Sequence, residues 1–234
     1  MPTQQDIEGL EKKYFEKIKT ILINHKTALI KGFNSKDAIK RDYANLGYKE
    51  NDVEKGAERV LQSLLSKQTN WDVNSAPISS DLLFETNDAM INIDAKTYKE
   101  RHQEKNKINV GANQISYGQH VRMVSRPRKR GASSTRYTWK SALRTIYHHQ
   151  ILGEIPCLTF FVKFIYDDVT KLLKKIELIS VPNGELENIY RNIFSRGKSK
   201  IKSGKPIRDI RVVINIFETP QLTSGWQRKE QIFP

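Results

Sequence analysis

The N-terminal part of the chain repeats its hydrophobic residues with helical spacing. The first apolar stripe has intervals of three and four positions and consists of Ile7, Leu10, Tyr14, Ile18 and Ile21. Charged residues lie between its members, so the pattern predicts an amphipathic helix that Gly32 and Asn34 bring to an end. A second helix is predicted over about 51–67, with an apolar stripe of Val53, Ala57, Val60, Leu61 and Leu64.

After Pro77 the pattern changes to short apolar runs. The runs 82–84 and 90–93 are separated by the turn residues Thr86-Asn87-Asp88, which predicts a β-hairpin. Further strands are predicted over 158–166, 176–181 and 210–217, and helices over 113–124, 137–151 and 184–194, before an irregular tail from Pro220. The pattern favours an α/β fold with a mixed β-sheet core flanked by helices.

We expect a single domain over 1–234. Residues 1–50 would form a helical N-terminal part that could mediate dimerisation, and 51–217 a catalytic core with loops that bind DNA. The chain has no stretch apolar enough to span a membrane and no secretory signal. Its one cysteine, Cys157, lies in an apolar run, which indicates a reduced thiol in a cytoplasmic protein with no membrane partner.

Net charge narrows the range of partners. The chain carries a formal charge of +14 and a pI of about 9.7, so it attracts polyanions. No acidic residue stands between Glu104 and Glu154, where ten Lys or Arg occur, or between Glu187 and Asp209, where seven occur. Folded surfaces usually mix both signs, so these windows indicate phosphate binding. Basic residues here include Arg126, Arg128, Lys129, Arg130, Arg136, Lys198, Lys200, Lys202 and Lys205.

The candidate chemistry lies in the predicted hairpin. Strand periodicity places Asn92, Asp94 and Lys96 on one face of the second strand. Pairing with the first strand would bring Asp81, thirteen positions earlier, close to Asp94. Two neighbouring carboxylates repel unless a cation joins them, and oxygen ligands suit Mg²⁺. The metal and the Lys96 ammonium would together promote hydrolysis of a phosphodiester.

The alternative interpretation is that Asp94 and Lys96 form a structural pair at a strand end and that Asp81 caps a turn. Other chemistries have little support in the sequence. One cysteine excludes a Cys-rich zinc finger, and the chain has no Gly-rich phosphate loop. The five histidines are scattered, and the neighbours His148 and His149 are not spaced as a metal pair on a helix.

The hairpin resembles the catalytic motif of the PD-(D/E)xK nucleases, and within them the type II restriction endonucleases. The similarity rests on 81–84 (DLLF) and 92–97 (NIDAKT), with Ser80 where many members have proline. The interval and the Asn113-Gln114-Ile115-Ser116 segment look most like the blunt-cutting EcoRV and HincII branch. The resemblance covers roughly 56–116.

The resemblance implies a Mg²⁺-dependent enzyme that cuts double-stranded DNA at a short palindrome. It implies a homodimer, because protein symmetry then matches that of the DNA, and a cognate DNA methyltransferase that protects host DNA. Glu58 would be an accessory metal or water ligand, although it could equally be a solvated side chain. Asn113 and Gln114 would contact base edges.

The loop of Arg126 to Arg136 would enter a groove or clamp the backbone; alternatively, phosphates alone order it. Phosphate binding is assigned to Lys198, Lys200, Lys202 and Lys205. Two rival functions remain open at this stage. One is a DNA repair or recombination nuclease of the same fold, and the other is a non-catalytic basic DNA-binding protein.

Overall fold

The computed structural model describes residues 2–35, 53–73, 81–101, 107–111, 142–186, 194–202, 205–215, 219 and 225–233. The described helices are α1 (Gln4–Asn24), α2 (Lys26–Asn34) and α4 (Val53–Gln68). No helix among them is long and apolar enough to cross a lipid bilayer. The described strands are β1 (Asp72–Val73), β2 (Leu82–Glu85), β3 (Met90–Lys99), β4 (Lys107–Gly111), β5 (Ala142–Leu143), β6 (Ile146–His149), β7 (Gly153–Tyr166), β8 (Leu173–Val181), β9 (Gly184–Glu185), β10 (Phe194–Lys202), β11 (Lys205–Asn215) and β12 (Lys229–Phe233).

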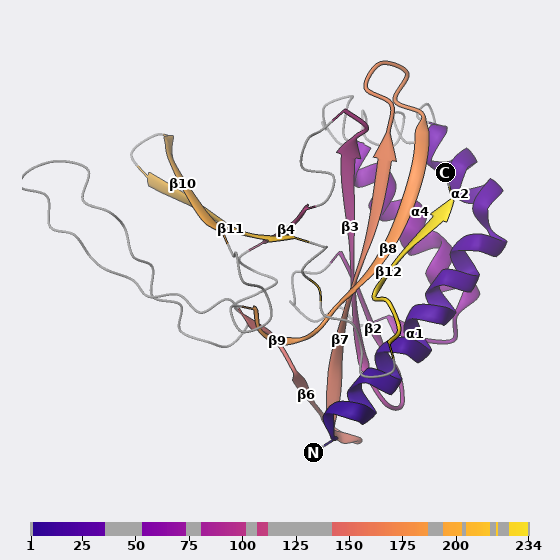
Figure 1. The fold of residues 1–234 in the computed structure, drawn as a ribbon, viewed down its shortest axis with the longest axis vertical. Coiled ribbons are helices and arrows are strands. Elements are labelled where there is room, and N and C mark those ends of the chain that lie inside the picture. The colour runs from indigo at the N-terminus through magenta and orange to yellow at the C-terminus, as the bar shows by residue number, and fades with distance from the viewer. Residues whose placement is uncertain are drawn as a thin grey trace, which may run out of the picture.

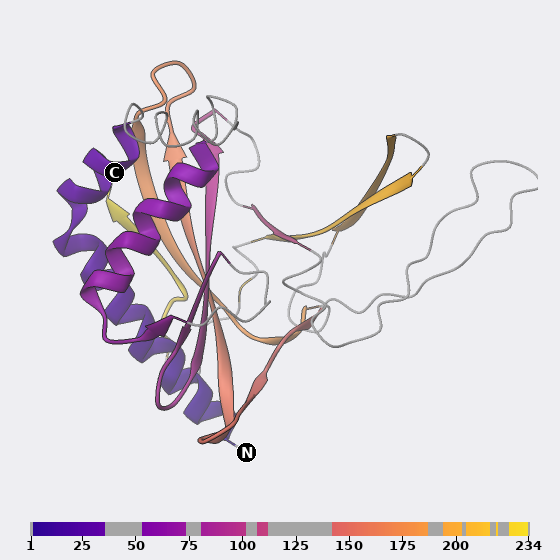
Figure 2. The same cartoon turned by 180° about the vertical axis from the view of Figure 1, so that it is seen from behind.

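A mixed sheet forms the centre of the molecule. Its strands follow the order β1-β2-β3-β7-β8-β12, and β6 pairs with the beginning of β7. The neighbours β3 and β7 run parallel, whereas the other pairs of this sheet are antiparallel. The helices cover one face of the sheet, and the smaller sheet β10-β11-β4 projects from the other side (Figures 1 and 2). The predicted α/β class with a mixed sheet is confirmed.

The helices form where the apolar stripes predict them. Thr3 caps α1, because its hydroxyl accepts the Asp6 N–H and the Asp6 carboxylate accepts the Thr3 N–H. The predicted first helix is divided at His25 into α1 and α2. Gly32 lies inside α2 rather than ending it. A Cβ there would come within 3.1 Å of Val60, so the glycine allows α2 and α4 to approach closely.

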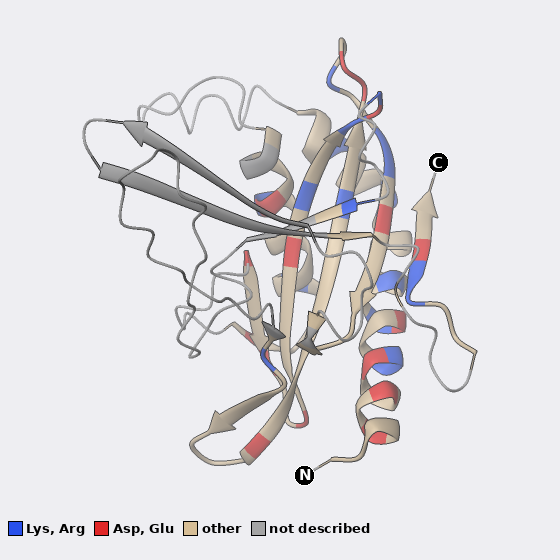
Figure 3. Cartoon of the chain, turned by 60° about the vertical axis from the view of Figure 1, so that its left-hand side comes forward, with Lys and Arg blue, Asp and Glu red and all other residues tan. Residues whose placement is uncertain are grey.

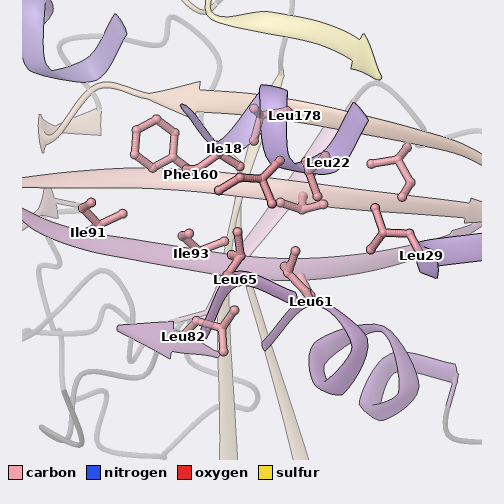
Figure 4. Close-up of a cluster of buried hydrophobic side chains, with 14 of the residues drawn as sticks. Ile18, Leu22, Leu29, Leu61, Leu65, Leu82, Ile91, Ile93, Phe160 and Leu178 are labelled. Carbon is pink, nitrogen blue, oxygen red and sulfur yellow. The ribbon is translucent and has the colours of Figure 1, made fainter. Parts of the chain in front are cut away.

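One apolar core joins the helices to the sheet. Alternate residues of β3 and β7 face it, and Figure 4 shows them meeting side chains of α1, α2 and α4. The labelled members are Ile18, Leu22, Leu29, Leu61, Leu65, Leu82, Ile91, Ile93, Phe160 and Leu178. Cys157 is buried and free, and burial raises the pKa of its thiol to about 12. The opposite faces of β3 and β7 carry Asp94, Lys96 and Lys163 among buried apolar residues such as Phe161.

The predicted helix over 137–151 is wrong where the structure describes it. Residues 142–143 form β5, and β6 pairs antiparallel with the start of β7. Gly153 has a φ of +77°, a conformation that few other residues adopt, at the turn into β7. The pairing partner therefore decided the structure of this segment, since its own pattern also fits a helix.

Three further predictions are corrected at the C-terminal side. The predicted helix over 184–194 is corrected at its ends, because Glu185 pairs with Ala142 and Phe194 begins β10, whereas Leu186 is helical. Part of the predicted irregular tail is β12, which pairs with β8. Strand β11 was predicted over 210–217 but begins at Lys205, where it forms a hairpin with β10. Each correction depends on a partner distant in sequence or on a turn.

Candidate active site

The hairpin β2–β3 brings Asp81 and Asp94 together. Leu82 pairs with Ile93 and Leu83 with Asn92, so one further step of this register places Asp81 opposite Asp94. The Asp81 carboxylate accepts a hydrogen bond of 2.7 Å from the backbone N–H of Ala95 and shares another with the Asp94 carboxyl. The proximity that the sequence predicted is therefore present.

The two carboxyl groups perturb each other electrostatically. Asp81 as a residue is exposed, but its carboxyl group lies against β3. This enclosure, followed by repulsion from Asp94, raises the pKa of Asp81 to about 7, although the Ala95 N–H and Lys96 act in the opposite direction. Near neutral pH Asp81 is therefore protonated in a substantial fraction of the molecules, whereas an isolated aspartate would be ionised.

Lys96 completes the group. Its ammonium forms an ion pair with the Asp94 carboxylate. The Asp94 side chain is only 3% exposed, whereas that of Lys96 is 18% exposed, so the amine can meet a substrate while the carboxylate is held within the protein. The strand alternation explains the placement, because Ile93 and Ala95 face the apolar core and Asp94 and Lys96 face the other side.

The donor chemistry of the pair fits a hard divalent cation. Asp81 and Asp94 offer carboxylate oxygens, and their mutual repulsion would be relieved by a metal with several bound waters. In the described part of the chain, no group of three or more His, Cys, Asp or Glu side chains is positioned to hold a metal. Two carboxylates leave several positions of a six-coordinate Mg²⁺ ion open, and water or substrate oxygens can fill them.

Glu58 lies on α4, which packs against β3, and is half-buried. Ala57 and Leu61 of the same helix belong to the apolar core. Its role as an accessory ligand stays a prediction.

The other acids of the hairpin have different partners. Glu85 pairs with His149. Asp88 in the turn pairs with Lys13 and accepts a hydrogen bond from the Tyr14 hydroxyl. Asp88 therefore ties the turn to α1.

Most of the predicted DNA contacts cannot be placed. Seven of them lie outside the described residues: Asn113, Gln114, Arg126, Arg128, Lys129, Arg130 and Arg136. Lys198 and Lys200 are on β10, in the hairpin that projects away from the central sheet (Figure 1). Their contact with DNA stays a prediction.

The structure also shows a charged pair that the sequence analysis did not single out. Lys163 on β7 and Glu177 on β8 lie in the same part of the sheet as Lys96. A signal was available, because Lys163 interrupts the otherwise apolar run 158–166 and Glu177 interrupts 176–181.

Comparison with known proteins gives one family and two similar folds. The model of the family described as "Type II restriction enzyme MwoI, N-terminal domain" matches residues 3–171, which include the hairpin. The restriction endonuclease BglI, bound to its DNA recognition sequence, has a similar fold with a TM-score of 0.63 and 18% identity, over 97% of this chain and 90% of BglI. The tetrameric restriction endonuclease SfiI, bound to cognate DNA, gives a TM-score of 0.58 and 16% identity, over 98% of this chain and 85% of SfiI. No curated protein matches by sequence.

Proposed function

The chain belongs to the type II restriction enzyme family of the MwoI N-terminal domain, and from this premise we propose that Asp81, Asp94 and Lys96 are its DNA-cleaving centre. The chain is a site-specific endodeoxyribonuclease. The observation that carries the proposed centre is the contact of the Asp81 carboxyl with both Asp94 and the Ala95 N–H, beside the Lys96–Asp94 ion pair.

Hydrolysis of a phosphodiester requires attack by water, loss of a proton from that water and stabilisation of added charge on the phosphoryl oxygens. The Lys96 ammonium is suited to two of these tasks. It can donate hydrogen bonds to the attacking water, which orients it, and to a phosphoryl oxygen, which stabilises the added charge. Asp94 holds the amine in place through the ion pair.

Asp81 and Asp94 are the residues that would hold a divalent metal, and Mg²⁺ is the ion that we propose. When bound, Mg²⁺ neutralises charge on the phosphate and makes water a better nucleophile. The Ala95 N–H fixes one oxygen of the Asp81 carboxylate, so this ligand is oriented before the metal arrives. Binding of a cation between Asp81 and Asp94 would favour the ionised form of Asp81 and release its proton.

A cleavage assay on supercoiled plasmid with and without Mg²⁺ tests the centre. We expect discrete fragments from the wild-type protein only when metal is present, and a loss of at least 100-fold in rate, as an order of magnitude, for Asp94→Asn. Asp88→Asn is the matched control, because it removes a carboxylate from the same hairpin at a position tied to α1. Cutting by Asp94→Asn at the wild-type rate would remove the residue from the mechanism.

The remaining features are proposed on the same premise. Double-stranded DNA is the substrate, and a homodimer would cut the two strands of a palindrome, each subunit cutting one. A cognate DNA methyltransferase would protect host DNA. Sedimentation of the protein at the concentration of the assay tests the dimer, and a persistent monomer would contradict it. Assignment to the blunt-cutting EcoRV and HincII branch is tested by sequencing the cut ends.

We also propose that 1–234 form one nuclease domain, with 51–217 as its catalytic core. The support is that α1 and α2 share the apolar core with α4 and the central sheet. Because the inner faces of α1 and α2 are used in this way, any dimer contact made by these two helices would involve their outer faces.

A further inference from the structure

Three charged residues form one row across the central sheet beside the proposed active site. Lys96 on β3 pairs in register with Lys163 on β7, and Lys163 pairs in register with Glu177 on β8. Paired residues on neighbouring strands direct their side chains to the same face, so Lys96, Lys163 and Glu177 form a charged row. In Figure 3 the charged positions of these strands lie next to one another.

The second and third members of the charged row are buried. Lys163 is 0% exposed and Glu177 is 3% exposed. The Lys163 Nζ lies 3.0 Å from the Glu177 Oε2 and 4.9 Å from the centre of the Tyr98 ring. Lys163 therefore has a carboxylate on one side and an aromatic ring on the other. It has no access to DNA, so any part that it plays in cleavage must be indirect.

Stability alone does not account for this lysine. A buried ion pair must overcome the loss of hydration of both charges, and apolar residues of similar size are often at least as stabilising. Burial lowers the pKa of Lys163 in spite of the opposing effect of Glu177, which indicates that the charged form is held at a cost. The neighbouring strands are apolar at most positions, so a methionine or leucine would suit the site.

Three of the described residues lie next to Lys96 on its face of the sheet. Asp94 precedes it by two residues and attracts the ammonium, Tyr98 follows by two, and Lys163 stands beside it on β7. A fixed cation on the next strand disfavours any rotamer that carries the Lys96 ammonium toward β7. Tyr98 is buried and is held by Lys163, so it limits movement in the other direction along the strand.

We propose that Lys163, held by Glu177 and Tyr98, is a positioning residue that keeps the Lys96 ammonium at Asp94. This inference rests on the proposed function of Lys96 and extends it to residues that do not touch the substrate. Lys163 acts through its fixed charge, which raises the energy of Lys96 rotamers that point toward β7 above that of the rotamer at Asp94. Glu177 and Tyr98 keep that charge in place.

The variant Lys163→Met tests the proposal with little risk to the fold. Glu177 keeps two other partners, Lys175 at 2.7 Å and Lys229 at 3.6 Å, so its carboxylate is not left without compensation. We expect the single-turnover rate of cleavage to fall roughly 10- to 100-fold, while the affinity for DNA, measured without Mg²⁺, stays within about twofold. Lys175→Met is the matched control, because it removes a more exposed partner of the same carboxylate and should leave the rate unchanged.

A double variant separates positioning from packing. In Lys163→Met with Glu177→Met the buried ion pair is replaced by apolar side chains, so thermal stability should return to the wild-type level or exceed it. The cleavage rate should remain low, because the positioning charge is absent. If this double variant recovers both stability and rate, the charged row is structural and the inference is overturned.

Crystal structures of the metal-free proteins supply a readout that does not depend on activity. We expect the Lys96–Asp94 ion pair in the wild type and its loss or a change of Lys96 rotamer in Lys163→Met. An unchanged ion pair in the variant would refute the positioning role, even if the wild type proves not to cut DNA. Failure of the wild type to cut, with the Lys96 shift present, would refute the proposed function alone.

Discussion

The ion pair between Glu11 and Arg228 joins the two ends of the described chain. Glu11 lies on α1 and Arg228 immediately precedes β12, and their exposures are only 2% and 5%. The Arg228 Nη2 lies 2.6 Å and its Nε 3.2 Å from the same Glu11 oxygen. The variant Arg228→Met removes both hydrogen bonds and retains the bulk of the side chain. The hydrogen bond from the Ser180 N–H to the Arg228 carbonyl does not depend on the side chain.

The expected loss of stability follows from the buried Glu11 carboxylate that the variant leaves without a partner charge. Removal of one partner of a buried ion pair costs about 3–5 kcal/mol, because the other charge stays buried without compensation. Burial already raises the pKa of Glu11, and Arg228 opposes that rise. Without Arg228 the pKa of Glu11 would rise further, so protonation would relieve part of the penalty in acid. We therefore expect a loss of about 3 kcal/mol or more at pH 7 and a smaller loss at pH 5.

Urea unfolding followed by circular dichroism at the two pH values measures this difference. Two control variants test whether the buried, uncompensated charge causes the loss of stability. Glu11→Met combined with Arg228→Met removes both charges and should recover most of the stability. Lys13→Met breaks a salt bridge whose side chains are 54% and 39% exposed, and should cost no more than about 1 kcal/mol.

Equal losses for Arg228→Met and Lys13→Met would refute the reasoning, because burial would then have no effect on the strength of an ion pair. A loss for Arg228→Met that grows as the pH falls from 7 to 5 would also contradict it. In that case the uncompensated carboxylate could not be the source of the destabilisation.

Two further predictions concern the sheet and its helical layer. Burial would raise the pKa of Glu177, but hydrogen bonds and charges from Lys175 and Lys163 hold it below its ordinary value. This contribution to stability is present above about pH 4.5 and is lost as the pH falls through the lowered pKa. The difference in unfolding free energy between wild type and Glu177→Gln should therefore shrink when it is measured below pH 4.5. A difference that stays constant with pH would contradict this prediction. Leu61→Ala should lower the unfolding free energy by about 2–5 kcal/mol, because Leu61 is fully buried in the core. The control Leu172→Ala, at an exposed hairpin tip, should change it by less than about 0.5 kcal/mol. Comparable losses for the two variants in chemical denaturation would show that the assigned core is wrong.

The hairpin could be predicted from the sequence because its signals are local. The runs 82–84 and 90–93 flank a turn, and the alternation on β3 separates Ile91 and Ile93 from Asp94 and Lys96. A short hairpin fixes its own register, so the meeting of Asp81 with Asp94 followed without knowledge of the rest of the fold. The basic windows of the chain could likewise be identified by counting residues.

Segments whose structure depends on a distant partner were predicted poorly. Residues 146–149 fit a helix by pattern but pair with β7, and 229–233 have no clear pattern but pair with β8. Lys163 and Glu177 could be noticed as charges in apolar strands, yet only the registers of β3, β7 and β8 place them beside Lys96.

By itself the sequence determined the amphipathic helices, the hairpin that joins Asp81 to Asp94 and the charge that attracts a polyanion, since each depends on periodicity, on turn residues or on composition. The tertiary structure decided which strands are neighbours, and hence that a buried lysine from β7 stands beside the amine on β3. The physical reason is that a strand leaves its backbone groups to be satisfied by another strand, and no local pattern specifies which one it will be.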